Sequence, residues 1–596
     1  MGKIRNTKTI KILHELQENH NHTWYEELYN RNKAWMEDTA IIYRGTRITY
    51  EIMFANMKDL AKALKSYGVV KGIEIPICIS NTPEFVYILG AVSMLGAKAN
   101  VFSTEFSKDY IAEILSECDA NIMFIEDAKY LECSDVVNKC HIEHIVISSL
   151  TDSLKDNYNP YDKYDSLHGK FVDYKKECRD IRLNLIDFGD LLKQGSEDTC
   201  DIVCEGGLDD EFLITYSSGS TNMGFPKGIV HNTRSLITIG RCHDPEIQKT
   251  ASMKNFVIMA LIPTQSNTDI ISSISDSFMQ GAVVALEPVY DKKFFKYALM
   301  INRPDYVVAT TSFWIYFAKQ ILCGKESKGI LLPELFVVFA VGEPLQINEE
   351  KLINLALKKV KAGTKRLPIP FVKISAAGGD CEHGGLFWIV FRAWQNLKPY
   401  NLLHRHEQGL KAFSMVDVAV LDKDGKYCKP YEYGRLVANS PCNMKEYKNN
   451  PEETKKFFIK DAYGKTWADC RVYSFIDHTG AIHIKGRISD MSEKVPVFYI
   501  AEEILKDRKN ILSCEVVKVK GKFVAHIELQ PIHIDNSAPI IRTIRKRCLK
   551  KFGSEIVKDI MYRIRGTKES FKLTACGKRD MAALIEEGLA QAEHLY

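Results

Sequence analysis

A loop rich in glycine and hydroxyl side chains, residues 217–228, directly follows the apolar run 212–216. It reads Ser-Ser-Gly-Ser-Thr-Asn-Met-Gly-Phe-Pro-Lys-Gly. Glycines let backbone N–H groups turn toward an anion, Ser and Thr add hydroxyl donors, and Lys227 adds a positive charge. This composition is typical of a loop that ends a strand and binds a polyphosphate. It is not a Walker loop, because it contains no Gly-Lys-Ser/Thr triplet.

Strand-like and helix-length segments alternate along the chain and would position such a loop. Three apolar runs have the pattern of parallel strands buried on both faces, namely residues 75–79, 121–125 and 144–148. Residues 83–97 have the length of a helix, and apolar segments alternate with turn residues over 256–286 and 306–341. We therefore predict an α/β architecture with a second layer. Residues 150–210 show little periodicity and are expected to form a surface excursion.

The composition limits the classes of function. With 45% hydrophobic and 26% charged residues, the chain is predicted to be a soluble globular protein, and its net charge of +4 gives no bulk attraction to nucleic acid. Residues 1–20 lack the apolar core of a signal peptide, and lysines interrupt the most apolar stretches, so we expect a cytoplasmic protein without a transmembrane segment. The sixteen cysteines include no Cys-x-x-Cys pair, which indicates free thiols and argues against a structural zinc site.

The loop 217–228 resembles the phosphate loop of the adenylate-forming superfamily, which contains acyl-CoA synthetases, stand-alone adenylation enzymes and luciferase-like ligases. It has two extra residues, Asn222 and Met223, relative to the pattern Ser-Gly-Ser-Thr-Gly-x-Pro-Lys-Gly. The resemblance implies that ATP phosphates are bound by loop residues Ser217, Ser218, Gly219, Ser220, Thr221 and Lys227.

Two further segments resemble the nucleotide-binding motifs of this superfamily. Residues 378–382 are similar to Tyr-Gly-x-Thr-Glu, with a glycine in place of the aromatic residue and a cysteine, a poorer donor, in place of the threonine. The resemblance implies that Glu382 is a catalytic residue and holds Mg²⁺, for which a carboxylate is a suitable hard ligand. It also implies nucleotide contacts by Gly379, Asp380 and Cys381, and by the backbone of the turn Gly342, Glu343 and Pro344.

The segment that should bind the ribose departs from the superfamily's pattern Trp-x-x-Thr-Gly-Asp. If Gly480 and Gly486-Arg487 fix the register, the aspartate position falls on Val472. Asp469 lies three residues earlier and is a candidate substitute, because a carboxylate can accept hydrogen bonds from two vicinal hydroxyls. This substitution requires a shift of the backbone.

Residues 486–490 resemble the Gly-Arg-x-x-Asp junction of the superfamily. The resemblance implies that Arg487 pairs with ribose or phosphate through its planar fork and that Asp490 is the interdomain hinge. Pro496 stands near a glycine position that faces the acceptor, and proline cannot copy the dihedral freedom of glycine. Residues 571–579 resemble Pro-x-Thr-x-x-Gly-Lys, so Lys578 corresponds to the lysine that aligns the α-phosphate and the attacking carboxylate.

Taken together, the resemblance implies a large multi-subdomain α/β adenylating domain, residues 1–487, and a small mobile α+β lid domain, residues 488–596. The implied reaction forms an acyl-adenylate from ATP, Mg²⁺ and a small carboxylic acid, and then transfers the acyl group to a thiol. The acceptor expected first is CoA. One alternative is the phosphopantetheine arm of an acyl or peptidyl carrier protein, since Asp269 lies about one residue from the substrate aspartate of amino-acid-activating relatives. A hypothesis of another class is that the protein is a catalytically degenerate regulator, which binds nucleotide without turnover.

Overall fold

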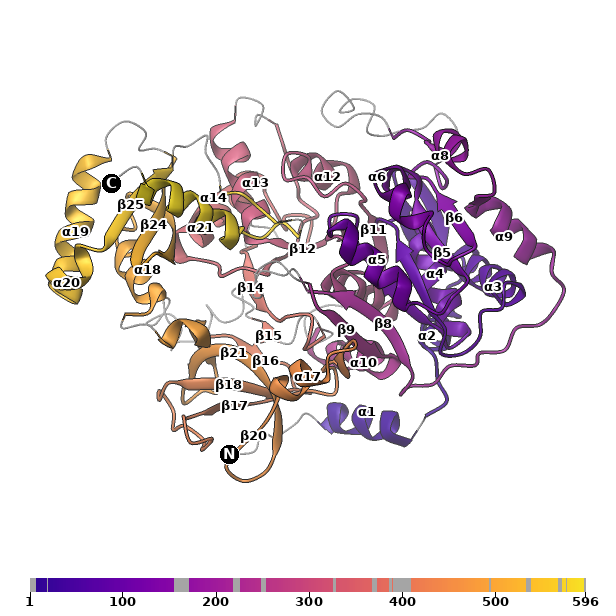
Figure 1. Ribbon diagram of the computed structural model, residues 1–596, viewed down its shortest axis with the longest axis horizontal. Coiled ribbons are helices and arrows are strands. Elements are labelled where there is room, and N and C mark those ends of the chain that lie inside the picture. Colours follow the sequence, from indigo (N-terminus) through magenta and orange to yellow (C-terminus); the bar gives the residue numbers. More distant parts are fainter. Residues whose placement is uncertain are drawn as a thin grey trace.

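Two large sheets with helices against them form the main body of the protein (Figure 1). The computed structural model describes residues 7–18, 20–154, 171–217, 226–247, 253–324, 329–366, 372–384, 388–389, 409–492, 495–531, 537–565, 571–574 and 576–593. The first sheet runs in the order β16 (Lys411–Ala412), β15 (Trp388–Ile389), β14 (Ser375–Gly378), β13 (Val337–Val341), β12 (Tyr306–Thr310), β10 (Val257–Ala260), β11 (Val283–Leu286), β1 (Thr39–Tyr43), β2 (Thr46–Thr49). The second runs in the order β19 (Glu446–Tyr447), β9 (Gly228–Asn232), β8 (Glu211–Tyr216), β4 (Lys98–Val101), β3 (Glu74–Cys78), β5 (Ile122–Glu126), β6 (His144–Ser148), β7 (Ile186–Asp187).

The predicted α/β alternation is confirmed, because the three apolar runs form β3, β5 and β6 and pair in parallel. The helices of this body are α1 (Thr7–Glu18), α2 (Trp24–Asn32), α3 (Tyr50–Ser66), α4 (Pro83–Met94), α5 (Lys108–Glu117), α6 (Asp127–Val137), α8 (Lys175–Ile181), α9 (Phe188–Glu197), α10 (Thr233–Ile247), α11 (Asp276–Met279), α12 (Phe295–Asn302), α13 (Thr311–Cys323), α14 (Ile347–Lys359) and α17 (Pro451–Phe457), with the π-helix η1 (Asp269–Ser275). The expectation of a surface excursion at 150–210 was incomplete. This stretch contains α8, α9 and β7, which extends the sheet edge by pairing with β6.

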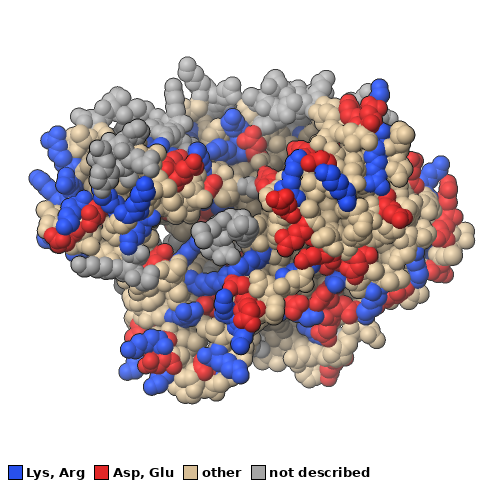
Figure 2. Space-filling view, viewed as in Figure 1, with Lys and Arg blue, Asp and Glu red and all other residues tan. Residues whose placement is uncertain are grey.

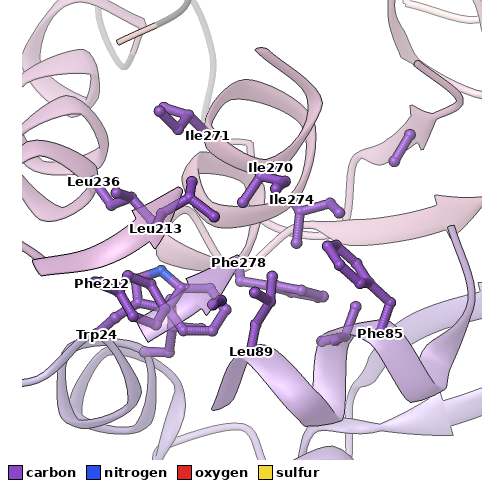
Figure 3. Close-up of a cluster of buried hydrophobic side chains, with 14 of the residues drawn as sticks. Trp24, Phe85, Leu89, Phe212, Leu213, Leu236, Ile270, Ile271, Ile274 and Phe278 are labelled. Carbon is purple, nitrogen blue, oxygen red and sulfur yellow. The ribbon is translucent and has the colours of Figure 1, made fainter. Parts of the chain in front are cut away.

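The largest core cluster joins the two sheets through the helices between them. Figure 3 shows side chains of α2, α4, β8, α10, η1 and α11 packed against one another. Trp24 is fully buried in this cluster, and its indole N–H donates to the hydroxyl of Ser275 at 2.7 Å. Burial of large apolar side chains from so many elements is the main term that holds the sheets together.

A third sheet and a C-terminal unit complete the fold (Figure 1). The third sheet contains β17 (Asp417–Leu421), β18 (Gly434–Asn439), β20 (Phe458–Lys460), β21 (Thr466–Ile476) and β22 (Ile482–Arg487), and the 3₁₀-helix η3 (Ile488–Ser492) follows it. The C-terminal unit contains a three-stranded sheet of β23 (Ile511–Val519), β24 (Lys522–Leu529) and β25 (Ile560–Arg565), with α18 (Val497–Leu505), α19 (Ala538–Phe552), α20 (Ser554–Val557) and α21 (Met581–Glu593). It has its own apolar core, as expected of a small α+β domain.

Acidic and basic side chains are mixed over the face seen in Figure 2, which agrees with the small net charge. None of the described helices has the length and apolar character needed to cross a membrane.

Candidate active site

Two of the predicted motifs, residues 342–344 and residues 378–382, lie at one edge of the first sheet. The strands β12, β13 and β14 are neighbours and parallel, so their carboxyl ends lie together. Thr310 ends β12, Gly342 follows β13, and Gly379 follows β14. Ligands of open α/β sheets bind outside the carboxyl ends of the strands, so this edge is where a nucleotide site is expected.

The phosphate-loop motif leaves the second sheet at β8 and returns at β9. The backbone N–H of Ser217 donates to the carbonyl of Lys227 at 3.0 Å, and the N–H of Lys227 donates to the hydroxyl of Ser217 at 2.9 Å. These bonds hold the two ends of the loop together. The predicted phosphate ligands Ser218, Gly219, Ser220 and Thr221 lie outside the described residues.

The side chain of Lys227 is held next to Tyr447. Its Nζ donates to Oε2 of Glu453 at 2.5 Å and lies 5.0 Å from the centre of the Tyr447 ring. The hydrogen bonds from Lys227 and Lys456 lower the pKa of Glu453 to about 2. Lys227 thus places a positive charge where the loop ends, and its partner, the Glu453 carboxylate, stays ionised.

Glu382, the predicted Mg²⁺ ligand, is buried and faces two polar groups from other elements. Its Oε1 accepts a hydrogen bond from the Tyr447 hydroxyl at 2.7 Å and lies 3.4 Å from Nη1 of Arg471. Its carbonyl accepts from the N–H of Met444 at 2.6 Å, which fixes the backbone of the turn. Burial and the neighbouring Glu382 carboxylate raise the pKa of Tyr447, so this hydroxyl remains a donor at neutral pH.

The other residues of this turn use their polar groups within the protein. The Asp380 carboxylate accepts from the backbone N–H of His383 at 2.9 Å and lies 2.6 Å from its Nδ1. Although burial opposes it, the Asp380 charge raises the pKa of His383 well above its ordinary value. The carbonyl of Cys381 is 2.7 Å from Nε2 of His231 and from Nδ2 of Asn267, and burial raises the pKa of the Cys381 thiol to about 12.

Lys578 reaches this edge from the C-terminal unit. A turn closed by the N–H of Thr574 on the carbonyl of Lys578, at 2.7 Å, presents the lysine. The hydroxyl of Thr310 donates to the carbonyl of Gly577 at 2.9 Å, and Gly577 has a φ of +69°, which suits glycine. The stem of Lys578 lies so close to Gly342 that a Cβ there would be 2.8 Å from its Cε. The structure therefore brings the C-terminal Gly-Lys motif against the turn at residues 342–344, which is predicted to contact the nucleotide.

Glu343 does more than the predicted backbone contact. Its carboxylate accepts from the N–H and hydroxyl of Ser312, at 2.9 and 3.1 Å, and from the N–H of Arg579 at 2.5 Å. The Arg579 guanidinium is buried between Glu343, Glu349 and Glu515, and forms ion pairs with all three. The next residue along the turn, Pro344, is exposed.

The predicted ribose and hinge residues lie on the third sheet and just after it. The carboxylate of Asp469 accepts from Nη1 of Arg435 at 2.5 Å and from the N–H of Arg471 at 2.8 Å, so its described contacts are within the sheet. Val472 pairs with Arg487 across β21 and β22, and Arg487 is exposed at the end of its strand.

The predicted hinge residue, Asp490, lies in η3. Asp269, the candidate substrate residue of the carrier-protein alternative, is fully buried in η1, where burial raises its pKa to about 7.

Sequence reasoning missed Arg471, Tyr447 and Arg579. One signal was available for Arg471: the register that places the ribose aspartate on Val472 places the preceding motif glycine on Arg471. The structure supports this register, because Arg471 has a φ of +56°. Tyr447 begins a segment that is similar to the superfamily's Tyr-x-Asn-Pro-Glu-x-Thr, and Arg579 ends the C-terminal motif, but sequence reasoning assigned neither residue a role in the site. Their partners became visible only when distant segments were brought together.

The chain is similar to known proteins over most of its length. The chain is 22% identical to a long-chain-fatty-acid–CoA ligase from Mycobacterium tuberculosis, over 77% of this chain and 76% of the relative. It is 23% identical to a luciferin 4-monooxygenase from Photuris pensylvanica, over 74% of this chain and 72% of the relative.

Solved structures share the fold over nearly the whole chain. A complex of anthranilate CoA ligase with anthranoyl-AMP has a TM-score of 0.73 at 17% identity, over 96% of this chain and 98% of that chain. A benzoate CoA ligase from Burkholderia xenovorans has a TM-score of 0.72 at 15% identity, over 95% of this chain and all of that chain. The predicted fold class is thereby confirmed. The family of AMP-binding enzymes matches residues 28–448, well over half of the chain, and this protein belongs to that family.

Proposed function

We propose that this enzyme activates a carboxylic acid with ATP and transfers the acyl group to CoA. A substrate carboxylate oxygen attacks the α-phosphorus, the bond between the α-phosphorus and the bridging oxygen breaks, and pyrophosphate leaves. The acceptor thiol, losing its proton to solvent, then attacks the acyl carbon, and AMP leaves from the adenylate. The CoA ligases among the relatives and solved structures support this choice of acceptor.

The observation that carries the proposal is the position of Lys578. Its turn contacts Gly342 and Thr310 at the carboxyl ends of β13 and β12. Its positive charge also acts on the Cys381 thiol, the neighbour of Glu382, because it opposes the rise in pKa that burial causes there. A lysine held there can stabilise negative charge on the oxygens that enter and leave the α-phosphorus and can align them. We assign the residues up to 487 to the adenylating domain and residues 488–596 to the lid that delivers this lysine.

The residues present are compatible with Mg²⁺. Glu382 offers a carboxylate at the site, and Mg²⁺ is commonly bound by one or two carboxylates together with substrate phosphates. Among the described residues, no cluster of three or more His, Cys, Asp or Glu side chains could hold a metal on its own. Glu382 would therefore hold an ion that arrives with ATP, and that ion supplies positive charge to the phosphate oxygens.

The second candidate is a regulator that binds nucleotide without turnover. It is favoured by Val472 at the ribose position and by the engagement of Asp469 with Arg435. A carrier protein remains the alternative acceptor.

A pyrophosphate-exchange screen over fatty, aromatic and amino acids tests the proposal. Exchange with one class of acid would identify the substrate class and exclude the regulator. ATP binding without exchange across the whole panel would favour the regulator. With the active acid in hand, thioester formation on CoA is then compared with loading of a phosphopantetheinylated carrier protein. Loading of the carrier alone would overturn the choice of CoA.

A further inference from the structure

Arg471 has an unusual backbone conformation in the middle of a strand. Its φ of +56° lies in the left-handed region, which residues with a Cβ rarely adopt. The other described non-glycine residues with positive φ lie in turns or just after a helix: Arg44, Asn255, Arg303, Lys361, Tyr431, Asn449 and Lys520. Arg471 alone among them lies inside a strand, β21, where such strain persists only if the surroundings impose it.

Polar contacts on both sides of the backbone hold this conformation. The N–H of Arg471 donates to Oδ1 of Asp469 at 2.8 Å, which tightens the chain between the two residues. Asp469 pairs with Val437 on one neighbouring strand, and Val472 pairs with Arg487 on the other. The strand therefore remains in its sheet on either side of the strained residue.

The side chain that emerges is directed at the candidate phosphate site. Its Nη2 donates to the hydroxyl of Tyr447 at 2.5 Å, and its Nη1 lies 3.4 Å from Oε1 of Glu382. The guanidinium carbon is 5.8 Å from the centre of the Tyr447 ring, and the ring is also 5.0 Å from Nζ of Lys227. Two cations, one from the phosphate-loop motif and one from β21, thus converge on Tyr447 beside the predicted metal ligand.

Enough of the Arg471 side chain remains open for a ligand. It is 37% exposed, whereas that of Glu382 is 10% exposed. A guanidinium carries five N–H donors in a planar fork that matches the oxygens of a phosphate group. Charge-assisted hydrogen bonds of this kind are among the strongest in proteins.

We infer that Arg471 binds the polyphosphate of ATP directly, as a second cation alongside Lys227, and that it shares Glu382 with the magnesium ion. This inference rests on the proposed function. It accounts for the strain, because the left-handed backbone presents the guanidinium at Glu382, a contact that a glycine at this position cannot make. It also implies that Arg471 neutralises part of the negative charge of the ATP phosphates, a role that Mg²⁺ would otherwise fill alone with Lys227.

Calorimetric titration with ATP in the absence of an acid substrate tests this role. Wild type and Arg471→Gly are compared in excess EDTA and in excess Mg²⁺, with adenosine as a ligand that lacks phosphates. We expect Arg471→Gly to bind ATP about 10-fold more weakly or worse in EDTA, and to lose less in Mg²⁺. Adenosine affinity should change less than about 2-fold, since the contact is to phosphate.

Two further variants control for folding and for strain. Arg471→Lys keeps the charge and loses the fork, so it should bind ATP in EDTA more tightly than Arg471→Gly and more weakly than wild type. Lys520→Gly also replaces a basic residue of positive φ by glycine, but in the turn between β23 and β24. It should leave the affinity for ATP unchanged.

Three outcomes would count against the inference. Equal ATP affinity of wild type and Arg471→Gly in EDTA would overturn it, and so would an equal loss of ATP and adenosine binding. If Arg471→Gly does not fold, the test passes to Arg471→Lys. An affinity of Arg471→Lys for ATP in EDTA equal to that of wild type would then overturn the inference. A wild-type protein that binds no ATP in either buffer would remove the proposed function itself.

Discussion

Lys578 is the residue on which the proposed first half-reaction depends most. Its backbone turn is anchored to Thr310, and its stem packs against Gly342, so its ammonium has a defined position at the sheet edge. A charge held in place before the reaction stabilises the transition state without a reorganisation cost.

Lys578→Ala should lower adenylate formation by about 10²-fold or more, because electrostatic stabilisation of this kind contributes several kcal/mol. Thioester formation from preformed acyl-adenylate should be nearly unchanged, since the lid is expected to move the lysine away for that step. Pyrophosphate exchange and single-turnover thioester assays measure the two effects. Lys572→Ala, an exposed lysine of the same segment, is the matched control. Equal losses in both half-reactions would contradict a lid with two positions.

Glu382→Gln removes a charge while keeping a side chain that can accept the hydrogen bond from Tyr447. We expect nucleotide to bind, the Mg²⁺ dependence of adenylate formation to weaken and turnover to fall sharply, because an amide is a poorer Mg²⁺ ligand than a carboxylate. Pyrophosphate exchange over a Mg²⁺ titration measures this. Wild-type activity at limiting Mg²⁺ would show that Glu382 is not the ligand.

At the residue scale, local motifs could be found from sequence and long-range partners could not. Glu382 and Lys578 each stand in a short segment whose residue types and order are informative. Arg579 follows Lys578 by one position, yet its three carboxylate partners are spread from residue 343 to residue 515. No local pattern marks such a group, because its environment is created by tertiary packing.

At the element scale, the strongly apolar strands were predictable because parallel strands buried on both faces require continuous apolar runs. The elements within 150–210 were missed, since α8 and α9 are short and β7 is a two-residue edge strand. Their formation depends on contacts with the body, such as the close packing of α9 on α3, where a Cβ at Gly195 would overlap the carbonyl of Asp59.

Pro496, which stands near a glycine position of the superfamily, is the residue that precedes α18. Its φ of −57° is one that proline adopts without strain.

The hinge is an element-scale prediction. Asp490 lies in η3, between β22 and α18, where a rotation of the lid would be absorbed by a few backbone dihedrals. Asp490→Pro fixes one φ and should hold the lid in one state. We expect one half-reaction to fall about 10-fold or more while the other changes little, as measured by pyrophosphate exchange and by thioester formation. Asp490→Ala, which keeps the backbone freedom, should affect neither strongly. A parallel response of both half-reactions to the proline would argue against a hinge here.

At the scale of the whole molecule, the C-terminal unit, which we propose to be the lid, is held against the body by polar groups. The amide of Gln346 donates to the carbonyl of Cys514 at 3.0 Å, and that of Asn348 donates to the carbonyl of Ile511 at 2.8 Å. Arg579 lies in the same interface and pairs with Glu349 of the body and Glu515 of the lid. A buried cluster with more carboxylates than cations favours at least one protonated carboxyl.

Glu349 should make this docking sensitive to pH. Burial raises its pKa from 4.5 to about 7, against the opposing effects of Arg579 and Ser513. In the docked state Glu349 therefore holds its proton more tightly than when the lid is away and the carboxyl is exposed to water. Between pH 4.5 and 7 the docked state binds more protons, so docking is favoured at low pH and weakened as pH rises through this window. The effect is at most about 3 kcal/mol.

Hydrogen exchange of the β23 amides, corrected for the intrinsic pH dependence of exchange, measures this change. Protection of the Cys514 amide, whose N–H donates to Oε1 of Gln346 in the body at 3.2 Å, should fall between pH 5 and pH 8 in wild type. Glu349→Gln is neutral at every pH and keeps an amide able to bond Arg579 and Ser513, so its protection should vary much less over the same range. Glu555→Gln, an exposed carboxylate of the lid, should behave as wild type. If Glu349→Gln loses protection with pH as wild type does, another group controls the docking; if wild type shows no change, the buried carboxyl does not titrate in this window.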